Sequence, residues 1–192
     1  MQSVPPLQSL KSSYPTSQKE DLAKELGFSG KDLDQIVALW GNTCAVRMSY
    51  CLLKCGITLG KEQGRGDETE IRIGALKGKH IWMNQKKLSE HLKSLFGSPT
   101  YLGKDKDQLM KKIGEGGGII SFVGLAEHTV LKIPLAAAYP GGHVDVVYYD
   151  NSLWTGTLGD RYDLMIQEVG WSSWGFQVQC KRATEIRFWR AS

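Results

Sequence analysis

Two residues far apart in the sequence have the types and settings of a thiol nucleophile and its base: Cys44 and His143. Cys44 follows capping-type residues and opens a long apolar segment that stops at Gly56, so a helix with Cys44 in its first turn is predicted. There the positive end of the helix dipole favours the thiolate over the thiol. His143 opens a predicted strand directly after two glycines, where small residues leave room for a substrate or a helix end. The pair predicts nucleophilic catalysis by a thiol, with His143 as general base.

Each of these residues has a simpler interpretation when it is taken alone. Cys44 is then a small buried residue and His143 a satisfied core or surface histidine. The combination favours catalysis, because a helix that carries the thiol and packs on a sheet that carries the imidazole brings both into an open groove. The remaining histidines, His80, His91 and His128, are expected to be structural or at the surface, with His128 as the reserve candidate for the base.

Two aspartates compete to orient the imidazole of His143. If the hairpin turns near residues 151–152, Asp160 lies roughly across from His143 on the next strand, a favourable place for a hydrogen bond. Asp145 shares the face of His143 through the strand period of two, although neighbours along one strand point side by side rather than at each other. Either one is equally well explained as a solvated carboxylate, and the choice between them stays open.

Asn42 and Arg47 flank the nucleophile on the predicted helix. The side-chain amide of Asn42 is a candidate donor to the oxyanion that forms on attack, alongside the backbone N–H of Cys44. Capping of the helix is the commoner use of an asparagine at such a position, and both roles remain open. Arg47 is expected to be a structural ion-pair donor rather than a catalytic group.

The bulk composition predicts a folded domain and excludes several classes of protein. The chain has 192 residues, of which 41% are hydrophobic and 23% charged, near the averages of globular proteins. The net charge of +4 is mild and not gathered into a block, so nucleic acid is not expected as a partner. No stretch approaches the ~20 apolar residues of a membrane span, and the N-terminus lacks an export signal. We therefore expect no membrane insertion, and synthesis in the cytoplasm without a signal peptide.

The elements that must position these residues follow an α+β pattern. Residues 1–18, rich in Pro, Ser and Gln, are expected to be a loosely held, flexible arm, and residues 19–192 a single domain. Apolar periodicity predicts helices over residues 17–26, 29–40, 42–55, 85–96 and 104–113, and strands over residues 71–73, 118–125, 142–149, 153–158 and 184–189. The N-terminal helices should therefore pack on a small antiparallel sheet.

No metal or cofactor is expected from the motifs of the chain. Cys51 and Cys55 have no partner pair at the spacing of zinc ligands. The Gly-rich segment 115–118 lacks the following Lys and Ser or Thr of a phosphate-binding loop, and no GxSxG motif is present.

Three motifs resemble the fourth group of type VI secretion amidase effectors: N-x-C-x-x-R-M-S-Y at residues 42–50, a later GIISFVG strand, and G-H-x-D-x-V at residues 142–147. That family has N-x-C-x-x-R-M-S-Y at the nucleophile and G-H-x-x-L-W at the base, on an NlpC-type, papain-like fold. The resemblance covers roughly the middle two thirds of the chain. The Leu-Trp of the second motif is replaced here by residues 147–149, and the family's aspartate maps only loosely onto Asp160.

The resemblance implies hydrolysis of the amide between the γ-carboxyl of D-glutamate and meso-diaminopimelate in the peptidoglycan stem, without a metal or cofactor. It also implies delivery into the periplasm of a rival cell and neutralisation by a cognate immunity protein. In that oxidising compartment Cys180 is a candidate partner for Cys51 or Cys55, although free burial is expected. Two other functions remain open: a catalytically silent papain-like binding module, and a cysteine peptidase or acyltransferase that acts on protein.

Overall fold

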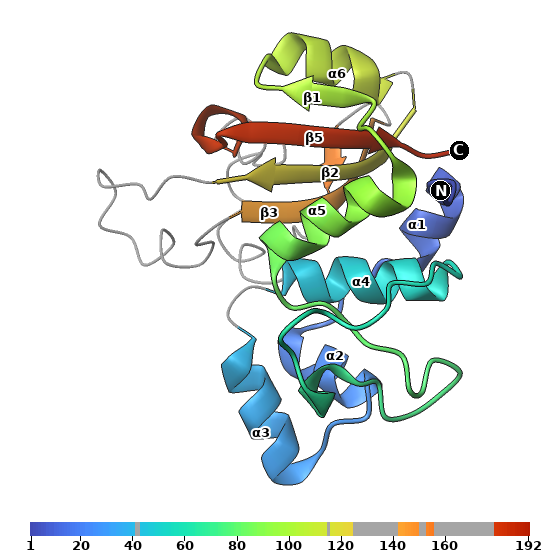
Figure 1. Ribbon diagram of the computed structural model, residues 1–192, viewed down its shortest axis with the longest axis vertical. Coiled ribbons are helices and arrows are strands. Elements are labelled where there is room, and N and C mark those ends of the chain that lie inside the picture. Colours follow the sequence, from blue (N-terminus) through green and yellow to red (C-terminus); the bar gives the residue numbers. More distant parts are fainter. Residues whose placement is uncertain (41–42, 115, 125–141, 150–152, 156–178) are drawn as a thin grey trace.

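The computed structural model describes residues 1–40, 43–114, 116–124, 142–149, 153–155 and 179–192. The helices are α1 (Leu7–Ser13), α2 (Lys19–Glu25), α3 (Gly30–Leu39), α4 (Cys44–Lys54), the short 3-10 helix η1 (Asp67–Thr69), α5 (Gln85–Phe96) and α6 (Lys106–Gly114). The strands β1 (Tyr101–Gly103), β2 (Gly118–Val123), β3 (Gly142–Tyr149), β4 (Leu153–Thr155) and β5 (Glu185–Arg190) form one antiparallel sheet in the order β1-β5-β2-β3-β4. This architecture confirms the α+β prediction (Figure 1).

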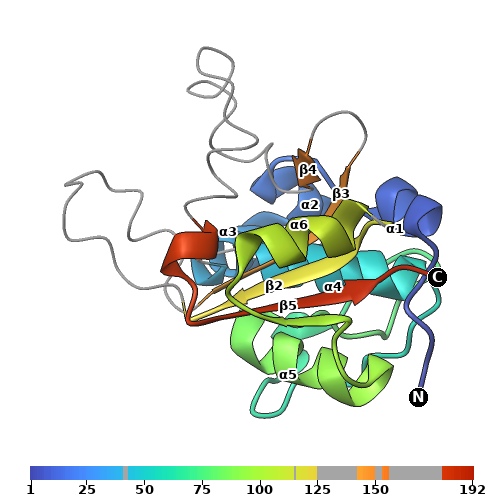
Figure 2. The same ribbon diagram turned by 90° about the horizontal axis from the view of Figure 1, so that it is seen from above.

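Alternate residues of the central strands contribute to two separate clusters of buried side chains. Ile119 of β2 lies in register with Val146 of β3 and Trp189 of β5, and all three join the larger cluster with α1 to α5. Their chain neighbours Ile120 and Phe188 join the smaller cluster with α6. Figure 2 shows α5 and α6 on opposite sides of β2 and β5. The strand period of two thus gives each face of the sheet its own core.

Helix α4 lies at the centre of the helical half. It packs against β3, and α2 and α3 lie on the side of α4 that faces away from the sheet (Figure 1). Its buried residues run without a break from Cys44 to Leu53. The sequence predicts one buried face, but α4 is covered on every side, and its polar residues find partners there. One example is Ser49, whose Oγ accepts the backbone N–H of Trp82 at 2.9 Å.

Residues 1–18 differ from the loosely held arm that the sequence predicts. They contain α1, and Leu10 of that helix has no exposed surface. Arg47 of α4 donates from Nη1 to the carbonyl of Pro15 and from Nη2 to the carbonyl of Ser17, both at 2.8 Å. Local composition does not reveal these contacts, because the partner of the segment lies 30 residues further along the chain.

Helix α5 agrees with its prediction at both ends, whereas two short strands do not. The side chain of Asn84 accepts the backbone N–H of Lys87 at 3.0 Å, and Gly97 follows the helix with φ 81°. Residues 71–73, predicted as a strand, are not one, and only an isolated bridge joins Glu70 and His80 nearby. The edge strand β1 was not predicted, because three residues are too short for a periodic signal.

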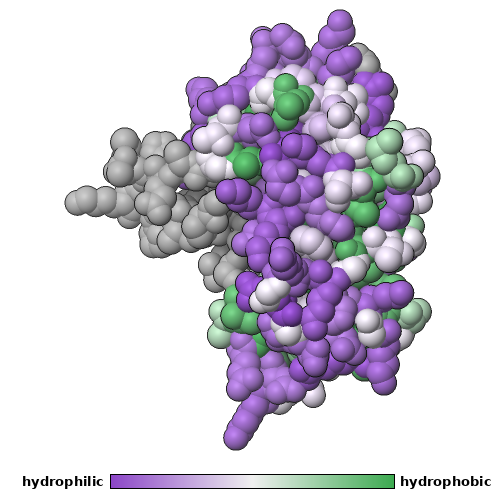
Figure 3. Space-filling view, viewed as in Figure 1, coloured by the Kyte–Doolittle hydropathy of each residue, from purple (hydrophilic) through white to green (hydrophobic). Residues whose placement is uncertain are grey.

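The molecular face in Figure 3 is mostly hydrophilic, with hydrophobic side chains in small separate groups. Among the described residues, no single helix is long and apolar enough to cross a bilayer. By length and composition alone, α3 and α4 taken as a pair meet that test, with an angle of 113° between them.

Candidate active site

The packing of α4 on β3 brings Cys44 and His143 together. Cys44 is the first residue of α4, after the N-cap Thr43, and His143 is the second residue of β3. The thiol of Cys44 lies near enough to the imidazole of His143 to raise its pKa. The structure therefore joins the two residues that the sequence analysis singled out as nucleophile and base.

Asp145 supplies a carboxylate to the same imidazole. His143 Nε2 lies 3.3 Å from Oδ2 of Asp145, and Oδ1 of the same carboxylate accepts the backbone N–H of Val146 at 2.8 Å. The second hydrogen bond fixes the orientation of the carboxylate. The expectation that neighbours along one strand point side by side does not hold here, because the two side chains lie on one side of β3 and meet.

Three other candidates lie outside the described residues: Asn42, Asp160 and the reserve histidine His128. The remaining two histidines take part in structural contacts. The ring of His91 stacks on that of Trp82 with centroids 4.4 Å apart, and Nδ1 of His80 lies 3.1 Å from a threonine hydroxyl.

The surroundings of His143 favour its protonated form. Burial lowers the pKa of His143, but hydrogen bonds to Asp145 and Cys44, together with their charges, outweigh it and raise the pKa from 6.5 to about 10. An imidazolium placed between a carboxylate and a sulfur is the arrangement that stabilises a thiolate nucleophile.

The pH dependence of stability follows from this shift. Folded His143 keeps its proton up to a pH of about 10, whereas the unfolded chain releases it near 6.5. The contribution of His143 to the free energy of unfolding is therefore expected to be fully present below pH 6.5 and to be lost as the pH rises towards 10, by at most ~1.4 kcal/mol for each unit between the two values. Urea unfolding of the protein and of His143→Gln over this range measures the effect. A variant with the same slope as the unmodified protein would contradict the assignment to His143.

Gln85, the first residue of α5, holds the backbone of β3 at the histidine. Its Nε2 donates to Ser121 Oγ at 2.8 Å and lies 3.4 Å from the carbonyl oxygens of Phe122 and His143. At Gly142, an added Cβ would lie 2.1 Å from Oε1 of Gln85 and 2.5 Å from the carbonyl of Phe122, so only glycine fits. The sequence analysis did not find Gln85, because its partners are far away along the chain and leave no local pattern.

The site is closed, whereas the sequence predicts an open groove. Cys44 has no exposed surface, and the exposed fractions of His143 and Asp145 are 4% and 1%. The imidazole lies against the ring of Phe122, with centroids 6.4 Å apart. The segments that lead into the two reactive residues, 41–42 and 125–141, are outside the described part of the chain.

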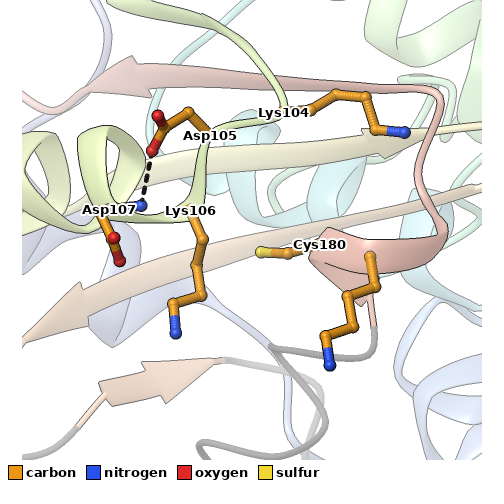
Figure 4. A pocket seen from close by; sticks show the side chains of 6 residues that line it. Lys104, Asp105, Lys106, Asp107 and Cys180 are labelled. Carbon is orange, nitrogen blue, oxygen red and sulfur yellow. Dashed lines mark hydrogen bonds between the residues drawn. The ribbon is translucent and has the colours of Figure 1, made fainter.

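The described residues form a hollow at another place, the N-terminal end of α6 (Figure 4). It has a volume of about 420 Å³ and is lined by Lys104, Asp105, Lys106, Asp107, Cys180 and Lys181. The residues that line it include neither Cys44 nor His143. In the described part of the chain, no group of three or more His, Cys, Asp or Glu side chains is arranged to hold a metal ion.

The chain matches a known protein family and is similar in fold to several solved structures. The model of the family described as type VI secretion system, amidase effector protein 4, matches residues 40–189. The solved structure of the type VI effector Tae4 from Enterobacter cloacae is 21% identical, with a TM-score of 0.56 and full coverage of both chains. The Tae4–Tai4 complex from the same organism covers 98% of this chain and 99% of that one at the same identity and TM-score. The complex from Salmonella Typhimurium is 14% identical, with a TM-score of 0.58 and the same coverage. No curated protein matches the chain. At these identities the solved structures show a common fold.

Proposed function

We propose that this chain, which belongs to the family of type VI secretion system amidase effector protein 4, hydrolyses an amide of the peptidoglycan stem with Cys44 as nucleophile. The family consists of amidase effectors that act on peptidoglycan. The observation that carries the proposed mechanism is the packing of α4 on β3, which puts the Cys44 thiol near His143, whose Nε2 lies 3.3 Å from Asp145.

In the proposed reaction, the sulfur of Cys44 attacks the carbonyl carbon of the scissile amide, and the electron pair of the C=O bond moves to oxygen. Backbone N–H groups in the first turn of α4 are suited to stabilise this oxyanion, because the first N–H groups of a helix have no intrahelical acceptor. The His143 imidazolium then gives its proton to the departing nitrogen, and an acyl thioester remains on Cys44. Neutral His143 next removes a proton from water, and the water oxygen attacks the thioester carbon. The C–S bond then breaks, which releases the carboxyl product and restores the Cys44 thiolate beside the His143 imidazolium.

For the bond, we propose the amide between the γ-carboxyl of D-glutamate and meso-diaminopimelate. Support comes from the nucleophile motif at residues 42–50 and from the family match over residues 40–189. An NlpC-type, papain-like fold fits a thiol at a helix start beside a histidine on a strand. We further propose a cognate immunity protein as partner, since the similar effectors from Enterobacter cloacae and Salmonella Typhimurium were solved with Tai4. The place of action would be the periplasm of a target bacterium.

Digestion of purified sacculi, followed by mass spectrometry of the soluble products, tests the proposal. The expected fragments end in the free γ-carboxyl of D-glutamate or begin at the amino group of diaminopimelate. Fragments that arise from another cleavage would refute the assigned bond. Failure to release any fragment, from sacculi or from soluble disaccharide peptides, would refute the hydrolase.

Asp145→Asn is expected to lower kcat by about 10²- to 10⁴-fold, because it removes the charge that helps to hold the proton on His143. The same change should move the alkaline limit of the rate–pH profile to lower pH. Asp160→Asn is the matched variant, and it separates the two carboxylates that the sequence leaves open. If Asp160→Asn gives the larger loss and Asp145→Asn leaves the profile in place, Asp160 is the orienting residue instead.

The burial of Cys44 favours a second candidate function, a catalytically silent papain-like binding module, because a substrate cannot reach a sulfur with no exposed surface unless the site opens. Labelling with a thiol-directed electrophile near neutral pH distinguishes the two. The experiment needs a Cys55→Ser background, since Cys55 is the most exposed of the four cysteines. An active enzyme is expected to be labelled at Cys44, and soluble muropeptides should slow the reaction. A folded protein that is never labelled at Cys44 supports the silent module.

A further inference from the structure

Cys51 and Cys55 lie one turn apart at the C-terminal end of α4, and the proposed hydrolase uses neither of them. Helix α4 ends at Lys54, and Cys55 is its C-cap. Residues four apart on an α-helix have Cα atoms about 6.2 Å apart, inside the range of about 4.4–6.8 Å found across disulfides. Both cysteines are free, and each acts on the pKa of the other thiol.

The two thiols differ in exposure and in the direction of their pKa shifts. Cys55 is half-buried, whereas Cys51 has no exposed surface and its Sγ lies 3.5 Å from the carbonyl oxygen of Leu10. The interaction with the Cys51 thiol is the main cause that lowers the pKa of Cys55 to about 7, with help from Ser13 and Lys54 and against the effect of burial. The same interaction, together with burial, raises the pKa of Cys51. A reachable thiolate beside a buried resolving thiol is the arrangement of redox-responsive cysteine pairs.

We propose that Cys51 and Cys55 form an oxidisable dithiol that closes to a disulfide by exchange with a disulfide oxidant, such as glutathione disulfide or the disulfide of an oxidoreductase. The Cys55 thiolate attacks one sulfur of the oxidant, and one oxidant thiolate leaves. Cys51 then loses its proton and attacks the Cys55 sulfur of the mixed disulfide, which expels the second oxidant thiolate. In total the two cysteines lose two electrons and two protons, and the oxidant becomes two thiols.

Formation of the Cys51–Cys55 disulfide requires a local movement, and the C-terminal end of α4 allows it. Cβ atoms four residues apart on a helix are about 5–6 Å apart, whereas a disulfide needs about 3.5–4.5 Å. Cys55 lies beyond the last helical residue, and its backbone N–H still donates to the carbonyl of Cys51 at 3.0 Å. Only the terminal turn therefore has to tighten, and the start of α4 is unaffected.

Cys180 is an unsuitable alternative partner for either thiol. It belongs to the smaller core cluster beside α6, whereas Cys51 belongs to the larger cluster and Cys55 packs against it. The sheet separates these two clusters. A disulfide between Cys180 and the end of α4 would therefore need a rearrangement of the core.

Peptide mapping of the folded protein tests the proposal without any substitution. After incubation with glutathione disulfide and alkylation of the remaining thiols, trypsin cleaves behind Arg47, Lys54 and Lys61, which separates Cys51 and Cys55. The expected result is that peptides 48–54 and 55–61 are joined and have lost two hydrogens. The proposal would be overturned if both cysteines are still alkylated after prolonged incubation with the oxidant. A disulfide from either of them to Cys44 or Cys180 would also overturn the proposal.

Two variants test the order of the steps. Cys51→Ser removes the resolving thiol, so Cys55 is expected to accumulate a stable glutathione adduct. Cys55→Ser removes the attacking thiol, so Cys51, which has no exposed surface, is expected to react with glutathione at least about tenfold more slowly than Cys55 does in Cys51→Ser. Cys180→Ser is the matched control and should oxidise like the unmodified protein. A persistent Cys55 adduct in the unmodified protein, with no closure, would contradict the proposal even if a variant failed to fold.

Discussion

Cys44→Ala is expected to lower kcat on muropeptides by at least about four orders of magnitude, because it removes the sulfur that forms the acyl intermediate. The same change should alter the free energy of unfolding by only about 1 kcal/mol, since alanine leaves a small space where the sulfur lay in the buried first turn of α4. Product release from soluble disaccharide peptides, followed by chromatography, measures the first effect. Urea unfolding measures the second.

The matched control for this experiment is Cys180→Ala. Cys180 is also a buried free cysteine, 4% exposed, but it lies in the smaller core cluster beside α6. Its replacement removes the same atom from a comparable environment and should leave kcat unchanged. Turnover by Cys44→Ala at a rate near that of the control would exclude the thiol mechanism, whereas the bond assignment would still depend on the product masses.

Arg47→Met is expected to reduce the free energy of unfolding by about 3–5 kcal/mol. Arg47 is 1% exposed, and its guanidinium donates to Thr43 Oγ1 at 3.1 Å and to the carbonyls of Pro15 and Ser17 at 2.8 Å. Methionine fills much of the same volume but removes the donor that these oxygens share, and the loss of buried hydrogen bonds to a charged group is costly. Chemical unfolding followed by tryptophan fluorescence gives the value.

Arg72→Met is the surface counterpart of this change. Arg72 is 39% exposed and pairs with Asp32 at the surface, so its loss should cost about 1 kcal/mol or less. A similar loss for both variants would mean that Arg47 does not hold residues 15–17 against α4. Arg47→Lys keeps the charge but not the forked geometry, and it should recover only part of the stability.

The parts of the site that have strong local signals could be predicted from the sequence. The helix that begins at Cys44 could be predicted from its long apolar segment and from Gly56, which follows the C-cap with φ 83°, although the N-cap Thr43 makes no side-chain capping hydrogen bond. His143 lies at the start of a strand, because an alternating run follows two glycines. Their contact with each other was inferred from chemistry, and the packing of α4 on β3 supplies it.

The parts that sequence analysis did not predict depend on contacts between distant segments. Nothing near Gln85 in the sequence indicates that its amide would donate to Ser121, which lies 36 residues further along. The sequence leaves the choice between Asp145 and Asp160 open, because strand periodicity gives the face of a side chain but not its rotamer, which is what lets Asp145 reach His143. Burial of the site likewise results from packing of whole elements around α4, which no local pattern reports.

The anchoring of residues 15–17 by Arg47 determines where the chain can be shortened. A truncation that begins at residue 19 would delete Leu10 from the core, together with both carbonyls that accept hydrogen bonds from the Arg47 guanidinium. Helix α4, which carries Cys44, would then lose the residues that bury it on this side. Expression of a trimmed catalytic fragment should therefore yield an insoluble or unfolded product. Purification tags and reporter fusions belong ahead of Met1, where the side chain is fully exposed.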